Sequence, residues 1–542
     1  MNNAIFKFDN PQNEPILQYG KGSKEREQII SELNRMSNDQ IEIPLIIGGK
    51  EIRTGKTSKV AMPHNHGKTL AIYHQATEKE IQLAIDEALK AKEMWENLSW
   101  IERSSIMLRA AELLSKKYRS LIVASTMLGQ GKNVYQAEID AACEVIDYLR
   151  YNVYFASTIY NGQPKSEFGQ LNRMEYRALE GFIFTVSPFN FTAIASNLNM
   201  SVALLGNTTV WKPATTSLLS NYYLMKIFME AGLPAGVVNF IPGSGSLIGN
   251  TVLKHKYLAG IHFTGSTATF NSLWRGVAEN LTNYVSYPKL VGETGGKDFI
   301  FVHNSANPIE VATAIVRGAF EYQGQKCSAA SRSYIPKSLW NEIKQHLLNQ
   351  VSQIKVGGVE NFENFVNAVI DESSFDKIMN YIELAKKSKE CEILAGGTGD
   401  KTVGYFIQPT IIQTTNPYFT TMQEEIFGPV MTIYVYDDKD YQETLNICNK
   451  TSPYALTGSI FAYDKYAMIQ ACRTLRYAAG NFYINDKPSG AMVGLQPFGG
   501  ARSSGTNDKA GGSMNLLRWI SPRTIKETFL PAQDFKYPFM EI

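Results

Sequence analysis

The chain has 542 residues, too many for one ordinary hydrophobic core, so we expect two or three packed units. Its 44% apolar and 19% charged residues are typical of a globular protein. The 53 basic and 51 acidic residues leave a net charge of +2, which provides no long-range attraction to nucleic acid or to an anionic membrane.

The cysteines and the first residues bear on the compartment. Five widely spaced cysteines fit neither a disulfide framework nor a zinc site and indicate a reducing environment. The first residues resemble neither a secretory signal nor an Arg-rich presequence, and no apolar run of the roughly 18 residues that a membrane span needs occurs. We therefore expect a cytoplasmic protein, or a mitochondrial-matrix protein if a presequence has been removed.

The first part of the chain is mainly helical in pattern. Residues 24–45 and 78–150 are charge-rich and repeat their apolar positions with a helical period. Between them, residues 43–57 (IPLIIGGKEIRTGKT) predict a strand and a hairpin turn.

From residue 181 onward, short apolar runs alternate with amphipathic helical stretches. Such alternation is typical of a parallel sheet covered by helices. The first set of predicted strands contains GFIFTVS, TTVWKP, VVNFIPG and LAGIHFTGS. The second set contains DFIFVH, SRSYIP, VMTIYVYD, GSIFAYD and GNFYIN.

Three short matches to known motifs favour structural interpretations. In residues 49–57 (GKEIRTGKT), the glycines are spaced one residue too far apart for a phosphate-binding loop. His64 and His66 have no third metal ligand nearby, so we expect solvated loop side chains and no metal site. The glycines of residues 243–249 exceed the dinucleotide fingerprint by one residue, and a close-packing turn is the simpler interpretation.

Cys327 is the strongest candidate for chemistry, within QGQKCSAAS (residues 323–331). A cysteine is more often a packing residue, but Lys326 would favour a thiolate, and the small neighbours leave room for a substrate carbon. The other cysteines lie in helical or strand patterns and predict packing roles: Cys143, Cys391, Cys448 and Cys472.

Two polar residues near predicted strand ends complete a candidate mechanism. Glu293 lies among glycines in VGETGGK (residues 291–297), where a carboxylate can act as a base for water. Asn190 comes after the strand GFIFTV, and an amide there can donate to a developing oxyanion. Taken singly, a loop glutamate and a turn asparagine are ordinary features.

Seven motifs in chain order, namely SPFNF, VWKPA, FTGS, GETGGK, GQKCS, EEIFGPV and QPFGG, resemble those of the aldehyde dehydrogenase superfamily over roughly residues 40–530. Within it, FEYQGQKCSAASR, SPFNFTAIASNLNM and GLQPFGGARSSGTNDKAGG are most similar to the branch of Δ1-pyrroline-5-carboxylate dehydrogenases. That branch oxidises glutamate γ-semialdehyde to glutamate with NAD, the second step of proline breakdown. The resemblance implies an α/β fold with a Rossmann-type NAD-binding domain, an α/β catalytic domain and a small β oligomerisation flap.

The resemblance also implies domain ranges: residues 1–159 and 179–292 for the N-terminal helices and NAD-binding domain, and 293–485 for the catalytic domain. Residues 160–178 and 515–542 would form the flap and the C-terminal tail, and 486–514 the substrate-anchoring loop. The partner expected is a small-molecule substrate, with no nucleic acid and no membrane, in a homodimer or higher homo-oligomer.

Site residues carry over by motif. Cys327 resembles the nucleophile, Glu293 the base for hydrolysis and Asn190 the oxyanion donor. The residues implied for NAD are Ser187, Lys212, Gly265, Ser266, Glu425 and Phe427. The residues implied for the substrate are Glu138, Lys326, Ser328, Gly490, Ala491 and Phe498.

Some positions depart from the superfamily pattern. Thr215 replaces a glutamate that often binds the adenosine ribose, so charge alone does not discriminate against NADP, although the branch mostly prefers NAD. Thr269 and Phe270 replace a common glycine, and Ala491 replaces a serine of some members.

Three alternatives remain open from the sequence alone. The chain could be another semialdehyde dehydrogenase, a non-catalytic relative, or a fused bifunctional enzyme that also makes the aldehyde. Retention of Cys327, Glu293 and Asn190 argues against the second, and the chain has no spare length for a flavin-dependent proline-oxidising domain.

Overall fold

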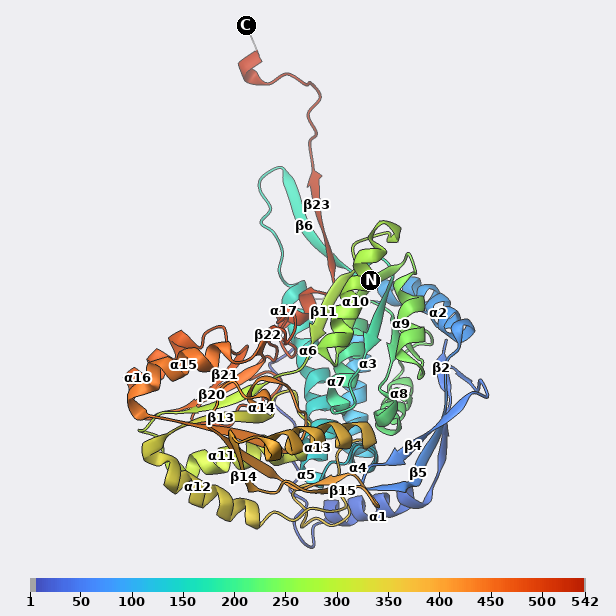
Figure 1. Cartoon of the computed structure of the whole chain (residues 1–542). Coiled ribbons are helices and arrows are strands. Elements are labelled where there is room, and N and C mark those ends of the chain that lie inside the picture. Colours follow the sequence, from blue (N-terminus) through green and yellow to red (C-terminus); the bar gives the residue numbers. More distant parts are fainter. Residues whose placement is uncertain (1–5, 541–542) are drawn as a thin grey trace.

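The structure, a computed structural model, describes residues 6–540 (Figure 1). Residues 1–5 and 541–542, which the predicted terminal ranges include, lie outside the described residues. Two seven-stranded sheets, each between layers of helices, form the two lobes of the body. None of the helices in residues 6–540 combines the length and the apolar character needed to cross a membrane.

The first sheet contains the four strands expected between residues 181 and 266. Its order is β11 (Lys289–Glu293), β10 (Leu258–Thr264), β7 (Phe182–Val186), β8 (Thr209–Lys212), β9 (Val238–Phe240), β2 (Leu45–Ile47) and β3 (Lys50–Ile52). The strands from β11 to β9 are parallel, and β2 and β3 add an antiparallel edge.

Both faces of this sheet are covered, which explains its apolar strands. Phe182 and Phe184 pack into one core with helices α2 (Glu78–Asn97) and α9 (Gly245–Leu253). Ile183 points to the opposite face and packs into the core formed with α7 (Thr192–Leu204), because successive strand side chains alternate between faces.

The second sheet contains all five strands expected after residue 297, together with two that the sequence did not suggest. Its order is β14 (Cys391–Ala395), β17 (Thr410–Thr414), β18 (Val430–Tyr436), β13 (Ala330–Pro336), β12 (Asp298–Val302), β20 (Thr457–Phe461) and β21 (Asn481–Ile484). Helices α11 (Pro308–Phe320) and α12 (Lys337–Ser352) contribute to the core on one face, and α13 (Glu372–Lys387) to the core on the other.

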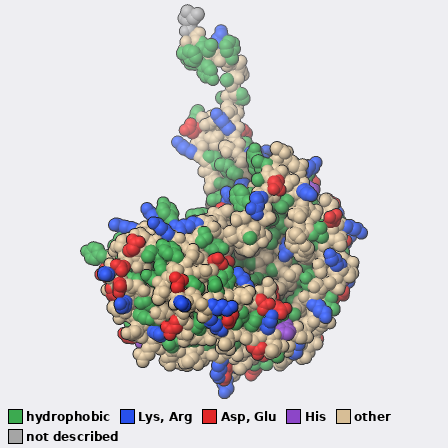
Figure 2. Space-filling view, viewed as in Figure 1, with side chains coloured by type: hydrophobic (Ala, Val, Ile, Leu, Met, Phe, Trp, Pro, Cys, Tyr) green, Lys and Arg blue, Asp and Glu red, His purple; other side chains and the backbone are tan. Residues whose placement is uncertain are grey.

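A two-stranded ribbon stands out from the body (Figure 1). It pairs β6 (Gln170–Arg177) with β23 (Ser521–Thr528) in antiparallel register, which confirms the predicted pairing of these distant segments. Beyond β23 the chain continues as an extended tail, and apolar side chains cluster toward its far end (Figure 2). The exposed apolar side chains of the tail are Phe529, Leu530, Phe535, Tyr537, Phe539 and Met540.

The three short motif matches have structural roles. Gly48 and Gly49, with φ of 57° and 74°, form the tight turn between β2 and β3, as the hairpin interpretation predicted. The expectation of solvated histidines is wrong for His64, which is buried against Glu360, whereas His66 is half-buried and bonds the carbonyl of Lys401. No metal-binding cluster of acidic, histidine or cysteine side chains occurs in the described residues.

The glycines of residues 243–249 lie where β9 leads into α9. Ser244 caps α9, accepting a hydrogen bond from Leu247. A Cβ on Gly243 would lie 3.1 Å from the backbone nitrogen of Ala76. The close-packing interpretation therefore describes this segment.

Candidate active site

Cys327 lies in a rigid loop between a short helical turn, Glu321–Gly324, and β13. Tyr322, Gln323 and Gly324 adopt left-handed backbone conformations, with φ of 51°, 57° and 66°, which non-glycine residues rarely do. The Gln323 side chain fixes this turn by donating to the backbone carbonyls of Gly131 and Ala368, at 2.7 and 2.9 Å. Strain held in this way is common where a reactive group must be positioned.

The thiol of Cys327 donates a hydrogen bond to the carboxylate of Glu293, with Sγ and Oε1 3.5 Å apart. Glu293 is the last residue of β11 and therefore lies at the carboxyl edge of the first sheet. Burial raises the pKa of Glu293 to about 7, and burial, followed by the charge of Glu293, raises the pKa of the Cys327 thiol. A resting thiol thus lies beside a carboxylate whose pKa suits a general base near neutral pH.

The expectation that Lys326 favours a thiolate is wrong. Its ammonium donates to Glu321 at 2.9 Å, and Lys487 lies 3.8 Å from the same carboxylate oxygen. Burial alone would raise the pKa of Glu321, but these two lysines hold that pKa below its ordinary value. The charge of Lys326 is therefore directed to Glu321, and Glu293 is the group that contacts the thiol.

Asn190 comes shortly after β7 and lies against the nucleophile loop. Its side-chain amide donates to the carbonyl of Gln325 at 3.1 Å, and a primary amide has a second hydrogen to donate. Asp140 holds this segment by accepting hydrogen bonds from the backbone N–H groups of Thr192 and Ala193, at 3.0 and 2.8 Å, and it is itself paired with Lys132 at 2.6 Å.

A cavity of about 680 Å³ opens onto Cys327. Among the predicted site residues, its wall includes Glu293, Lys326, Cys327, Ser328, Gly490, Ala491 and Phe498. The structure therefore brings together seven residues that the sequence spreads over two hundred positions.

Glu138, predicted for the substrate, lies elsewhere. It is fully buried and accepts hydrogen bonds from Tyr19, Leu17 and Arg119. The physical reason is local, because residues Glu138–Glu144 form a π-helical segment, η2, whose side chains do not follow α-helical phasing.

Glu144, at the other end of η2, lies in the cavity wall instead. Burial and then the charge of Asp140 raise the pKa of Glu144 to about 8. This residue was not predicted from the sequence, and neither were Asp147, Arg317 and Lys487, which line the same cavity. A helical wheel drawn with α periodicity gives no signal for Glu144, whereas Lys487 was detectable as a lysine just before the Gly490 loop.

The residues implied for the cofactor lie mostly along one edge of the first sheet. Lys212 ends β8, Ser187 comes directly after β7, and Gly265 and Ser266 come directly after β10. Parallel strands place these ends together, where open α/β sheets bind their ligands. Ser266 also caps helix α10 (Thr267–Glu279), whose N-terminus favours anionic groups.

Individual side chains differ in how open they are to a ligand. Burial lowers the pKa of Lys212, and no carboxylate lies within ion-pair distance of it in residues 6–540, so an external polar partner suits it. Ser187 is buried and its hydroxyl accepts from Trp211 at 2.9 Å, which leaves its backbone rather than its side chain for a ligand.

Two further residues reach this edge from the second lobe. Glu425 accepts from the backbone N–H of Gly296 at 2.9 Å. A Cβ on Gly295 would overlap the Glu425 carboxylate in this position, so the glycine leaves room for the carboxylate to approach. Phe427, with φ of 62°, packs edge-on against Phe189.

Residues 51–525 match the aldehyde dehydrogenase family. The chain belongs to this family. It is 53% identical over 540 residues to a protein named delta-1-pyrroline-5-carboxylate dehydrogenase, mitochondrial, from Dictyostelium discoideum, covering 99% of this chain and 97% of the relative. It is 47% identical over 530 residues to the protein of the same name from Homo sapiens, covering 98% and 94%.

Solved structures agree with this assignment. The delta-pyrroline-5-carboxylate dehydrogenase from Mycobacterium tuberculosis, bound with NAD, superimposes with a TM-score of 0.97 at 46% identity over the whole of both chains. The 1-pyrroline-5-carboxylate dehydrogenase from Thermus with bound NAD superimposes with a TM-score of 0.91 at 30% identity, covering 97% of this chain and all of that one. The expected aldehyde dehydrogenase fold is therefore confirmed.

Proposed function

We propose that this enzyme oxidises L-glutamate γ-semialdehyde to L-glutamate with NAD, the second step of proline breakdown. The observation that carries the proposal is the cavity itself. Its wall contains the Cys327 thiol and the Glu293 base together with positively and negatively charged side chains. Arg317, Lys326 and Lys487 line it with cationic groups around a single carboxylate, Glu321. The family membership and the relatives named above support the same reaction.

The substrate's amino-acid group fits these charges. Its α-carboxylate would bind at Lys326, Ser328 and the backbone N–H groups of Gly490 and Ala491, near the cationic cluster. Its α-ammonium would pair with Glu144, which takes the place predicted for Glu138. A buried charge left without a partner costs several kcal/mol, roughly, so this pairing would select strongly for an amino-acid aldehyde. Phe498 would pack against the aliphatic carbons.

The chain's residues would carry the reaction in two halves. Glu293 takes the proton of the Cys327 thiol, and the sulfur attacks the aldehyde carbon to form a thiohemiacetal, whose oxyanion accepts hydrogen bonds from Asn190 and the Cys327 backbone N–H. When bound, NAD accepts the hydride that leaves this adduct. Glu293, after passing its proton to solvent, takes a proton from the water that hydrolyses the resulting thioester, which releases glutamate and the thiol.

The residues at the sheet edge fit a dinucleotide. The ammonium of Lys212, which has no ion-pair partner among residues 6–540, would meet the adenosine ribose, and the α10 N-terminus with Gly265 and Ser266 would meet the pyrophosphate. Glu425 would accept from the nicotinamide ribose hydroxyls while Phe427 packs by the ring.

A substrate panel tests the proposal. Purified enzyme is assayed by NADH absorbance with the semialdehyde, with glutarate semialdehyde, which has the same carbon chain but lacks the ammonium, and with propanal, which lacks both charged groups. We expect kcat/KM to fall by about a hundredfold or more for propanal. Equal efficiency on all three aldehydes would favour a general aldehyde dehydrogenase, and no NADH from any of them would favour a non-catalytic relative.

Assembly and compartment also remain proposals. The β6–β23 ribbon and the exposed apolar side chains of the tail suit a homodimer or a larger homo-oligomer, which sedimentation of the enzyme and of a chain ending at residue 520 would test. For the compartment, several relatives carry the word mitochondrial in their names, which supports the mitochondrial matrix over the cytoplasm. Fractionation of cells that produce the full chain distinguishes the two.

A further inference from the structure

Residues 13–19, here called the strap, cross the helical layer without forming a helix or a strand. Glu14, Ile16 and Gln18 line the cavity, and the Pro15 carbonyl and the Tyr19 hydroxyl bond to the helical layer. The strap therefore forms part of the cavity wall, although it lies outside residues 51–525, which match the family.

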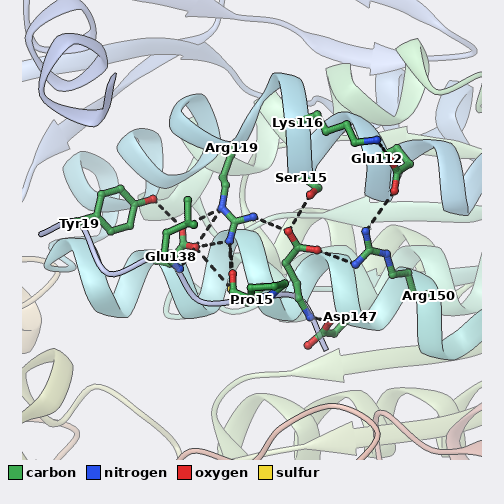
Figure 3. Close-up of polar contacts among 12 residues, drawn as sticks. Pro15, Tyr19, Glu112, Ser115, Lys116, Arg119, Glu138, Asp147 and Arg150 are labelled. Atoms are coloured by element: carbon green, nitrogen blue, oxygen red, sulfur yellow. Dashed lines mark hydrogen bonds and ion pairs between the residues drawn. The ribbon is translucent and has the colours of Figure 1, made fainter. Parts of the chain in front are cut away.

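Ion pairs fasten the strap to the helices. The carboxylate of Glu14 accepts from Ser115, Arg119 and Arg150, at 2.7, 2.5 and 2.7 Å. Arg119 in turn bonds to Glu138 and to the carbonyl of Pro15, as Figure 3 shows. Burial alone would raise the pKa of Glu14, but the hydrogen bonds from Ser115, Arg150 and Arg119 hold that pKa below its ordinary value. Such a network of buried charges with complete partners orders the segment it contains.

Asn13 connects the strap to the substrate-binding groups. Its side-chain amide donates to Asp147 at 2.7 Å and to the backbone carbonyl of Val493 at 2.8 Å, and its oxygen accepts from Tyr151 at 3.2 Å. Asp147 and Tyr151 belong to helix α6 (Val145–Tyr160), which begins directly after Glu144. Val493 belongs to the loop that begins at Gly490.

We propose that Asn13 is a positioning residue for substrate selectivity, and that the strap completes the site that recognises the α-amino acid group. Asn13 bonds both to Val493, in the loop that would bind the α-carboxylate, and to Asp147, in the helix that directly follows Glu144. It therefore holds this loop at a fixed distance from Glu144, which would bind the α-ammonium. The strap thus sets the separation between the two groups that would bind the zwitterion. This inference rests on the proposed function.

The backbone of the strap supports the same assignment. The N–H of Glu14 donates to Asp147 at 2.7 Å, so both oxygens of this cavity-lining carboxylate are occupied by the strap. Burial raises the pKa of Asp147 to about 6 although these two hydrogen bonds act to lower it, so the strap favours an ionised and oriented Asp147 at neutral pH. Asp147 is then a structural anchor, which leaves Glu144 to pair with a ligand.

The test uses two variants of the full chain and a matched control. Asn13→Ala removes all three hydrogen bonds, and Asn13→Asp keeps the shape while removing both amide donors and adding a charge beside Asp147. Asn10→Ala changes an exposed asparagine that precedes the strap. KM and kcat are measured with the semialdehyde and with propanal, glutamate binding is measured by calorimetry, and thermal unfolding is followed for all three.

We expect Asn13→Ala to raise KM for the semialdehyde about tenfold. A change of this size in binding is about what one hydrogen bond contributes on balance. The value of kcat should change less than about threefold. Glutamate should bind more weakly by a similar factor, Asn13→Asp should show a larger loss, and KM for propanal should stay unchanged. Asn10→Ala should match the wild type in every measurement.

The outcomes separate the two proposals. If Asn13→Ala lowers kcat for both aldehydes alike, or keeps wild-type KM and glutamate affinity, the strap has only a structural role and the inference is wrong. A wild-type enzyme that neither binds glutamate nor oxidises the semialdehyde overturns the proposed function and the strap's role with it.

Discussion

Replacing Glu293 by glutamine tests whether one carboxylate serves both halves of the reaction. In the wild type, its Oε1 lies 3.5 Å from the Cys327 sulfur, and a carboxylate with a pKa of about 7 is mostly ionised above neutral pH. Because burial raises the pKa of the thiol, very little thiolate forms near neutral pH without this base. General base assistance typically contributes about a hundred- to ten-thousand-fold in rate.

The rate of Cys327 alkylation by iodoacetamide gives the most direct assay. In the wild type, the rate should rise as Glu293 ionises and level off above about pH 7. In Glu293→Gln the carboxylate is absent, so the rate should depend on ionisation of the thiol alone. It should be at least about a hundredfold lower near neutral pH and keep increasing about tenfold per pH unit to beyond pH 9. Glu424→Gln, which removes an exposed carboxylate from the EEIFGPV segment, should keep the wild-type profile.

The burst of NADH in stopped-flow measurements reports the same step under turnover. We expect Glu293→Gln to give a burst near one per active site in amplitude, slow in rate and strongly accelerated by raising the pH, followed by very slow steady turnover. The reasoning would be refuted if Glu293→Gln gave a burst as fast as that of the wild type and if the alkylation rate of this variant did not depend on pH. Glu293 would then act only on the water of hydrolysis.

Three further changes probe other parts of the site. Cys327→Ala should abolish oxidation and leave NAD binding, followed by fluorescence quenching, nearly intact; retention of even a tenth of the turnover would contradict the covalent mechanism. Asn190→Ala should slow the burst about a hundred- to thousand-fold, whereas an unchanged burst would exclude it as the oxyanion donor. Asp140→Ala leaves Lys132 buried without its partner and should lower the free energy of unfolding by about 3–5 kcal/mol in denaturant titrations; a loss below about 1 kcal/mol would show that this buried pair stabilises little.

Much of the fold was predictable because its sheets are parallel and covered on both faces. Continuous apolar runs such as Phe182–Val186 are distinctive in sequence, and all nine such runs became strands in the two large sheets. β14 and β17 were missed because their apolar runs are brief. β14 lies at a half-buried edge with only Ile393–Ala395 consecutively apolar, and β17 has only Ile411 and Ile412 between polar residues. The roles of Cys327, Glu293 and Asn190 were inferred from motif order, and the structure places them around one loop.

The substrate pocket was less predictable, since its residues come from elements whose phasing or pairing the sequence does not show. Lys326 was expected to act on Cys327, but its partner Glu321 lies five positions earlier, across three left-handed residues. The strap had no motif to distinguish it. Its role depends on long-range contacts such as that between Asn13 and Val493, which no local pattern encodes. The predicted domain ranges and the roles of the cofactor residues remain predictions.

The π-helical segment η2 makes this site sensitive to insertions and deletions as well as to substitutions. Hydrogen bonds that span five residues instead of four accommodate an additional residue, and within these seven positions Glu138 faces the strap, Asp140 holds the segment next to Asn190, and Glu144 reaches the cavity. Removing one residue, such as Ala141, would let the segment relax to an α-helix and rotate its C-terminal half by about 100° relative to its N-terminal half. Glu144 could then leave the cavity while every functional side chain was retained. A relative could therefore have changed its aldehyde by losing one small residue here, a change that inspection of the family motifs alone would not reveal.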